Sequence, residues 1–149
     1  MSDAYIDTLL PYGVLVAVNR NSIDEITPSK PQIFQTELVQ AEGKGAFIEM
    51  IARAFNCPEP YGRNWDALHE VLRDLDWFQW NSVVLHLTNA RQLLSIPAAT
   101  AVVMLKILSN SSCYWKSRGK TFLTVLEGDK ELYGLVYNVL SDWHLRSLS

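Results

Sequence analysis

The sequence predicts an α/β fold in which helices pack against a central, mostly parallel β-sheet. One observation is a set of short, largely apolar segments typical of strands, at residues 12–19, 33–39, 83–87 and 121–127. The other is that segments with helical periodicity lie between most of these strands. Parallel strands need crossover connections, which are usually helices, so this alternation favours a parallel sheet.

Four segments carry apolar residues at the three- and four-residue spacing of an amphipathic helix. Three of them are residues 46–55, 65–75 and 131–143, and Asn64 is the expected N-cap of the second. The fourth begins at Ser95-Ile96-Pro97, with proline in its first turn, and runs through Leu108. Residues 21–32 include two prolines and are expected to form a loop.

The length and composition are those of a single folded domain, residues 1–149. The chain has 149 residues, of which 48% are hydrophobic and 19% are charged, and it has no low-complexity runs. Its longest apolar stretches fall far short of the ~20 residues that cross a bilayer. The N-terminus lacks the basic and apolar pattern of a secretion signal. We therefore expect no membrane association and a cytoplasmic location.

The charge balance argues against direct binding of nucleic acid. The net charge is −3 and the isoelectric point is near 5.5, whereas a nucleic-acid-binding protein usually carries a basic excess. The densest run of charge is acidic and lies around residues 66–76. A basic protein is therefore the more natural partner.

The sequence predicts neither a cofactor nor a metal site. Cys57 and Cys113 lie far apart and neither belongs to a CxxC pair, so both are expected to be reduced thiols. The chain contains no GxGxxG, P-loop, HExxH or EF-hand motif. Because no known motif places a serine or cysteine nucleophile, the chain is not expected to be an enzyme.

Three carboxylates follow one another at four-residue spacing in the helix predicted over residues 65–75. Asp66, Glu70 and Asp74 would share one face of this helix, because positions i, i+4 and i+8 align. Like charges at this spacing oppose helix formation by ~0.2–0.5 kcal/mol per pair. The pattern allows three interpretations: a solvated face, a general acid–base pair, or a docking surface for a cationic partner.

The segment around the first of these carboxylates resembles a family signature. It reads Tyr61-Gly62-Arg63-Asn64-Trp65-Asp66-Ala67-Leu68. This is similar to the Tyr-Gly-x-Asn-x-Asp-Ala-Leu motif of barstar-like ribonuclease inhibitors. The expected elements also follow the family's order, and the resemblance covers about residues 33–127. Residues 1–32 and 128–149 lie outside it, which predicts a barstar-like fold with an extra N-terminal strand and an extra C-terminal helix.

The resemblance implies a function for this helix. In the family, the helix and the loop before it fill the active site of a ribonuclease, with carboxylates in place of RNA phosphates. Asp66 matches a contact residue, and Glu70 falls at the position of the main inhibitory aspartate. The residues that this implies for partner binding are Tyr61, Gly62, Asn64, Asp66, His69, Glu70, Asp74 and Trp77.

The chain departs from the family at several positions of the implied interface. His69 stands where well-known members have tryptophan, and Pro60 replaces a tyrosine that contacts the enzyme. The acid that the family adds from a later helix is missing, and Ser109 or Asn110 falls near its place. Trp77 resembles a loop tryptophan of the family, and it either contacts the partner or covers the end of the sheet.

Three functional hypotheses follow. The leading one is an inhibitor or immunity protein, monomeric when free, that occludes the active site of a cytotoxic ribonuclease with its acidic helix face. The alternative keeps the fold but assigns another basic protein, or a toxin that is not a ribonuclease, as the partner. The third is a carboxylate-dependent hydrolase, which requires a cleft between Asp66 or Glu70 and another acid.

Overall fold

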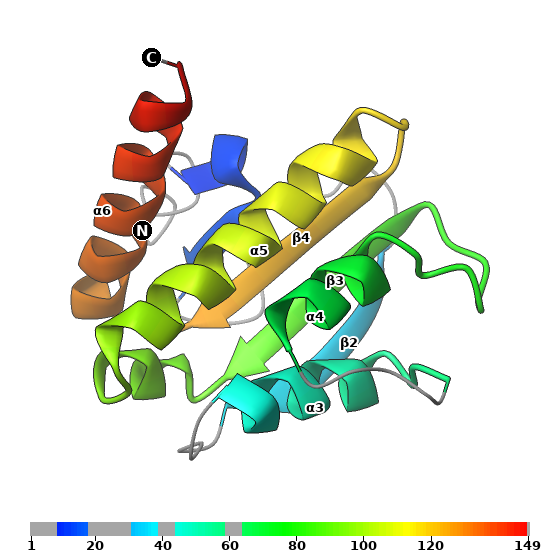
Figure 1. Cartoon of the computed structure of the whole chain (residues 1–149), viewed down its shortest axis with the longest axis horizontal. Coiled ribbons are helices and arrows are strands. Elements are labelled where there is room, and N and C mark those ends of the chain that lie inside the picture. Colours follow the sequence, from blue (N-terminus) through cyan, green and yellow to red (C-terminus); the bar gives the residue numbers. More distant parts are fainter. Residues whose placement is uncertain (1–8, 18–30, 39–43, 59–63, 149) are drawn as a thin grey trace.

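The computed structural model describes residues 9–17, 31–38, 44–58 and 64–148, which form helices packed against a β-sheet (Figure 1). In chain order the elements are η1 (Leu10–Tyr12), β1 (Val14–Ala17), β2 (Gln32–Glu37), α3 (Lys44–Ala54), α4 (Trp65–Leu72), β3 (Ser82–Thr88), η3 (Ala90–Leu94), α5 (Ala98–Lys116), β4 (Thr121–Glu127) and α6 (Lys130–Leu148). Every strand and helix predicted from periodicity is present, although several boundaries differ. Within these ranges, no helix has both the length and the apolar character that spanning a membrane requires.

The strands form one parallel sheet with the order β1-β4-β3-β2. β3 and β4 occupy its centre, and most of their residues are buried, as expected for central parallel strands. β2 lies at one edge and alternates between half-buried and exposed positions. The prediction of an α/β fold with a parallel sheet is confirmed.

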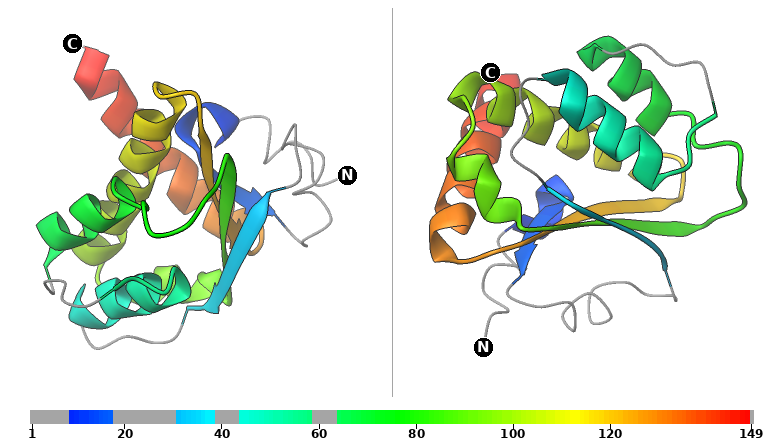
Figure 2. Two further views of the ribbon diagram at one scale, coloured as in Figure 1. Left: turned by 90° about the vertical axis from the view of Figure 1, so that its right-hand side faces the viewer. Right: turned by 90° about the horizontal axis from the view of Figure 1, so that it is seen from below.

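Helices α3, α4 and α5 cover one face of the sheet, and α6 packs beside α5 and β1 (Figure 2). Aromatic rings join the helical layer to the strands. The ring of Phe55, just after α3, lies 4.8 Å from the ring of Phe34 in β2 and 6.0 Å from that of Phe122 in β4. Burying such rings away from water holds the helices on the sheet.

The segments outside the resemblance add one strand and one helix, as predicted. β1 pairs with β4, where Val14 lies opposite Thr124, and α6 packs against β1. Gly13 enters β1 with φ at +75°, and a Cβ atom there would lie only 1.9 Å from the Oγ of Ser112 in α5. Glycine is therefore required for the close approach of this segment to α5.

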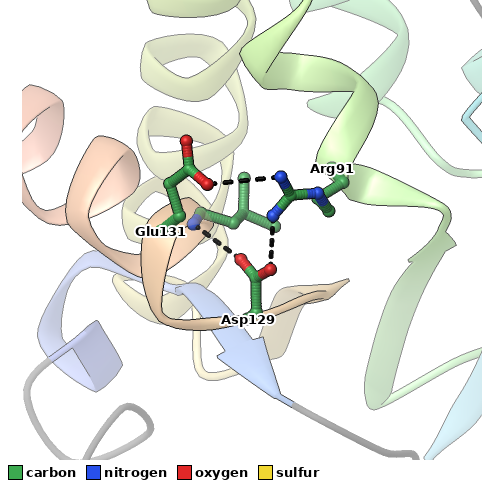
Figure 3. A network of polar contacts seen from close by, with 4 residues as sticks. Arg91, Asp129 and Glu131 are labelled. Atoms are coloured by element: carbon green, nitrogen blue, oxygen red, sulfur yellow. Dashed lines mark hydrogen bonds and ion pairs between the residues drawn. The ribbon is translucent and has the colours of Figure 1, made fainter.

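A small network of charged side chains joins the start of α6 to η3 (Figure 3). The guanidinium of Arg91 donates to the carboxylate of Asp129 and, at 3.2 Å, to that of Glu131. The Asp129 carboxylate also accepts a hydrogen bond of 3.2 Å from the N–H of Leu132, and this bond lowers its pKa. Asp129 thereby caps the first turn of α6 and orients the helix where it leaves the sheet.

Two helix boundaries correct the sequence-based expectation. α5 begins at Ala98, and Pro97 is its N-cap rather than a residue of its first turn. α4 ends at Leu72, because Leu75 has a positive φ of +39° that a right-handed helix does not allow. Leu75 is nevertheless buried in the core, which explains why its spacing suggested a longer helix.

Candidate partner-binding surface

A side-chain cap defines the N-terminus of α4. Asn64 has an extended backbone, and its Oδ1 accepts a hydrogen bond of 2.8 Å from the N–H of Ala67. The buried side chains of Leu68 and Leu72 hold the opposite side of the helix against the core. Asp66 is thereby placed in the first turn and exposed, where the positive end of the helix dipole favours its charge.

Asp66 and Glu70 are the carboxylates that α4 itself exposes, one helical turn apart. Among the residues that the structure describes, no basic side chain forms an ion pair with either of them. The prediction that Asp74 continues this helix face is wrong, because α4 ends at Leu72 and Asp74 lies in the turn that follows. Asp74 is exposed, but the turn rather than the helical spacing sets its position.

His69 lies next to Glu70 and contacts α5. Its Nε2 lies 2.9 Å from the Nδ2 of Asn110, and because an amide nitrogen can only donate, Nε2 accepts and the neutral ring carries its proton on Nδ1. Burial and the guanidinium of Arg73 lower the pKa of His69, and this outweighs the opposite effect of Asp66 and Glu70. α4 therefore presents a neutral imidazole beside its carboxylates.

Asn110 of α5 faces the exposed side of α4, whereas the buried Trp115 of α5 donates to the carbonyl oxygen of Leu72 at 2.7 Å. Ser109, the other candidate for this place, is buried, and its Oγ donates to the carbonyl oxygen of Tyr12 at 2.6 Å. Asn110 is exposed and reaches His69 across 41 positions of sequence. The structure thus extends the candidate surface from α4 onto α5, a contact that only the fold could show.

A cationic ridge, formed by Arg73 and Arg118 around the ring of Tyr114, borders this surface at the C-terminal ends of α4 and α5. The guanidinium carbon of Arg118 lies 3.6 Å from the centre of the Tyr114 ring, and that of Arg73 lies 5.6 Å from it. This ridge was not predicted from the sequence, although Asn110 and Tyr114 are four residues apart on one helix and therefore share a face. Basic side chains therefore lie at the end of α4 beside the exposed Asp74, whereas its start carries Asp66 and Glu70.

The ring nitrogen of Trp77 forms a hydrogen bond within the protein. Trp77 is half-buried, and its Nε1 donates to the carbonyl oxygen of Phe55 at 2.9 Å, while its ring packs on that of Phe78. These contacts favour the interpretation that Trp77 covers the end of the sheet, and its contact with a partner stays a prediction. The contacts of Tyr61 and Gly62 also stay predictions, because both residues lie outside the described part of the chain.

A comparison with protein-family models identifies a family for this fold. The model described as Barstar (barnase inhibitor) matches residues 32–127, which is well over half of the chain. The chain belongs to the barstar family. Comparisons with curated proteins and with solved structures gave no match. The resemblance indicated by the motif at residues 61–68 is therefore confirmed.

The barstar match begins at β2 and ends at β4, so it contains α4 and every candidate partner-binding residue, whereas β1 and α6 lie outside it. Because the family is one of inhibitors, the match argues against the hydrolase hypothesis. That hypothesis needs Asp66 or Glu70 in a cleft with another acid, yet both side chains are exposed. Across the described ranges, no three His, Cys, Asp or Glu side chains group closely enough to hold a metal ion.

Proposed function

We propose that this barstar-family protein is an inhibitor or immunity protein that occludes the active site of a cytotoxic ribonuclease. The observation that carries the proposal is the pair Asp66 and Glu70, exposed on a capped helix of a chain that belongs to an inhibitor family. A ribonuclease binds phosphates through basic side chains, and two carboxylates one helical turn apart can replace two phosphates. Such a protein acts in the cytoplasm of the cell that it protects and is monomeric until it meets its target.

The energetics of α4 support a role for these carboxylates outside the free protein. Asp66 and Glu70 repel each other by ~0.2–0.5 kcal/mol, and neither has an ion-pair partner within the described ranges. Carboxylates that contribute so little to folding are available to a cationic partner, whose approach they also accelerate. The proposed function therefore depends on two carboxylates that the folding of the free protein does not require.

The other candidate residues would frame this carboxylate pair. Asn64 sets the start of α4, and the neutral ring of His69 with the amide of Asn110 offers polar contacts beside Glu70. Tyr61 and Gly62 would contact the partner before the N-terminus of α4, and Asp74 and Trp77 would contact it after the C-terminus of α4. Because His69 replaces the family's tryptophan, we expect the target to differ from barnase.

The test compares the parent protein with the double variant Asp66→Asn/Glu70→Gln in capture of partners from the native lysate, followed by mass spectrometry. A second double variant, Asp142→Asn/Glu37→Gln, removes the same two charges from exposed positions on α6 and β2 and serves as the matched control. We expect the parent and the control to capture a basic ribonuclease and the α4 variant to lose it. Each lost charge-assisted hydrogen bond should weaken binding by about 1.5–3 kcal/mol, which is more than tenfold.

The stability of the variants separates loss of binding from loss of folding. The α4 variant should unfold at the same urea concentration as the parent, within about 0.5 kcal/mol, and the urea midpoint of the control shows whether it stays folded. If the α4 variant captures the ribonuclease as well as the parent does, the proposed interface is wrong. If all three proteins capture one basic protein that is not a nuclease, the alternative hypothesis of a barstar-fold interaction module replaces the ribonuclease inhibitor.

A further inference from the structure

A cavity of about 180 Å³ lies where η1, α5 and the start of β4 meet. Its walls include Leu10, Pro11, Ser112, Lys116, Phe122 and Leu123. It is smaller than the ~300–1,000 Å³ pockets of drug-sized ligands. It is close to the ~150 Å³ that accommodates a benzene molecule. The cavity therefore suits a ligand with an apolar body of about six carbons.

The cavity is separate from the candidate partner-binding surface. Ser112 and Lys116 are four residues apart on α5 and share one face, whereas Asn110 and Tyr114 share the face that meets α4. The two faces are offset by two residues, which is about 200° around the helix axis. η1, which closes the cavity, lies outside the family match. The cavity is thus a feature that the N-terminal segment of this chain adds to the barstar fold.

The strand pairing leaves a backbone donor of β4 facing this cavity. The N–H of Thr121 bonds to Asn81 on the β3 side, and the N–H of Thr124 bonds to the carbonyl of Gly13 on the β1 side. Because successive residues of a strand alternate in direction, the N–H of Phe122 points to the same side as that of Thr124. There η1 replaces a continuation of β1, and no hydrogen bond to the Phe122 N–H occurs within the described part of the chain.

Two side chains add to this donor. Ser112 is 8% exposed, its Oγ lies against Gly13 at the edge of the cavity, and no described residue forms a hydrogen bond with its hydroxyl group. Lys116 is exposed and forms no ion pair with a described residue. The ammonium of Lys120 is already engaged, because it lies 4.4 Å from the centre of the Trp80 ring. One ammonium group without an ion pair among the described residues and two neutral donors therefore border this cavity.

We propose that this cavity binds a small organic carboxylate with an apolar body of about six carbons. Its carboxylate accepts hydrogen bonds from the Phe122 N–H and the Ser112 hydroxyl group and pairs with the ammonium of Lys116. Its apolar body displaces water from Leu10, Pro11 and Leu123. A monoanion fits better than a phosphate ester, because the cavity offers a single free cation.

The test is an NMR titration of the ¹⁵N-labelled full chain with hexanoate, and with hexanamide as the uncharged analogue. Hexanoate should cause saturable shifts of the amide signals of Ser112, Lys116 and Phe122, with the Phe122 proton moving in the direction of a new hydrogen bond. It should also slow the alkylation of Cys113, which lines the cavity, but not that of Cys57, a reduced thiol that follows α3 and does not line the cavity. Hexanamide should bind more weakly, because it lacks the charge.

Variants assign the recognition to individual groups. Lys116→Gln should weaken hexanoate binding about two- to fivefold, the effect of one exposed ion pair, whereas Lys106→Gln on the same helix should change nothing. Ser112→Ala removes the hydroxyl group that lies against Gly13 and should weaken hexanoate binding, and its urea midpoint shows whether the variant stays as stable as the parent. Equal binding of hexanoate and hexanamide, or shifts that do not saturate or that lie away from the cavity, would overturn the proposal.

Discussion

At the scale of single residues, the ionisation of His69 changes the charge of the proposed interface beside Asp66 and Glu70. Its ring lies next to the carboxylates of Asp66 and Glu70 and the guanidinium of Arg73 on α4, and it contacts the neutral Asn110 on α5. Protonation would place a cation beside the two carboxylates and remove the acceptor that Asn110 uses. A basic partner would then meet a less acidic surface, so the neutral ring belongs to the binding form.

The lowered pKa of His69 also makes stability depend on pH. Because the unfolded chain binds this proton more readily than the folded one, the contribution of the neutral ring is complete above the ordinary pKa of 6.5 and is lost as the pH falls through the lowered value. The parent should therefore lose more stability than His69→Gln between about pH 7 and pH 5. Urea unfolding of both proteins across this range measures the difference. Parallel profiles would show that His69 titrates alike in both states.

At the scale of secondary-structure elements, the sequence predicted the type and order of the helices and strands better than the residues at which they end. β4 covers residues 121–127 as expected, because its apolar and β-branched residues lie between a glycine turn and a charged segment. α4 ends three residues early, because a buried leucine keeps helical spacing even where the chain turns through a positive φ. Contacts such as that of His69 with Asn110 could not be predicted, since local periodicity carries no information about which helices adjoin.

The cap of α4 links this element to the proposed function. Asn64→Ala removes the acceptor of the Ala67 N–H, and we expect it to destabilise the protein by about 1 kcal/mol. Asn64→Asp keeps an acceptor at the same place and adds a charge that the helix N-terminus favours, so it should retain the stability of the parent. Urea unfolding of the three proteins measures both effects. If the two variants are equally destabilised, the side-chain cap is not what defines the start of α4.

At the scale of the whole molecule, the extra strand and the extra helix share the core with the barstar match. β1 covers the edge of β4, which would otherwise expose unpaired backbone groups, and α6 packs against β1 and α5. Leu132, Val136 and Leu140 of α6 are fully buried in the same hydrophobic cluster as β3 and β4. The hydrophobic pattern of the sequence alone predicted that β1 and α6 exist. Their packing against the matched region depends on contacts between the two ends of the chain.

This shared core predicts that the chain unfolds as one unit. Leu140→Ala should lower the free energy of unfolding by about 2–5 kcal/mol, as for a residue in the centre of a core, whereas Asn138→Ala on the exposed side of α6 should change it by less than about 0.5 kcal/mol. The measurement follows urea unfolding by far-UV circular dichroism and by tryptophan fluorescence, in a Trp143→Phe background so that no tryptophan of α6 contributes. Coincident transitions that shift together in Leu140→Ala are expected, because opening α6 also uncovers β1 and α5. If helical signal is lost first while the fluorescence transition stays at the parent's midpoint, α6 is instead an appendage that melts independently of the barstar core.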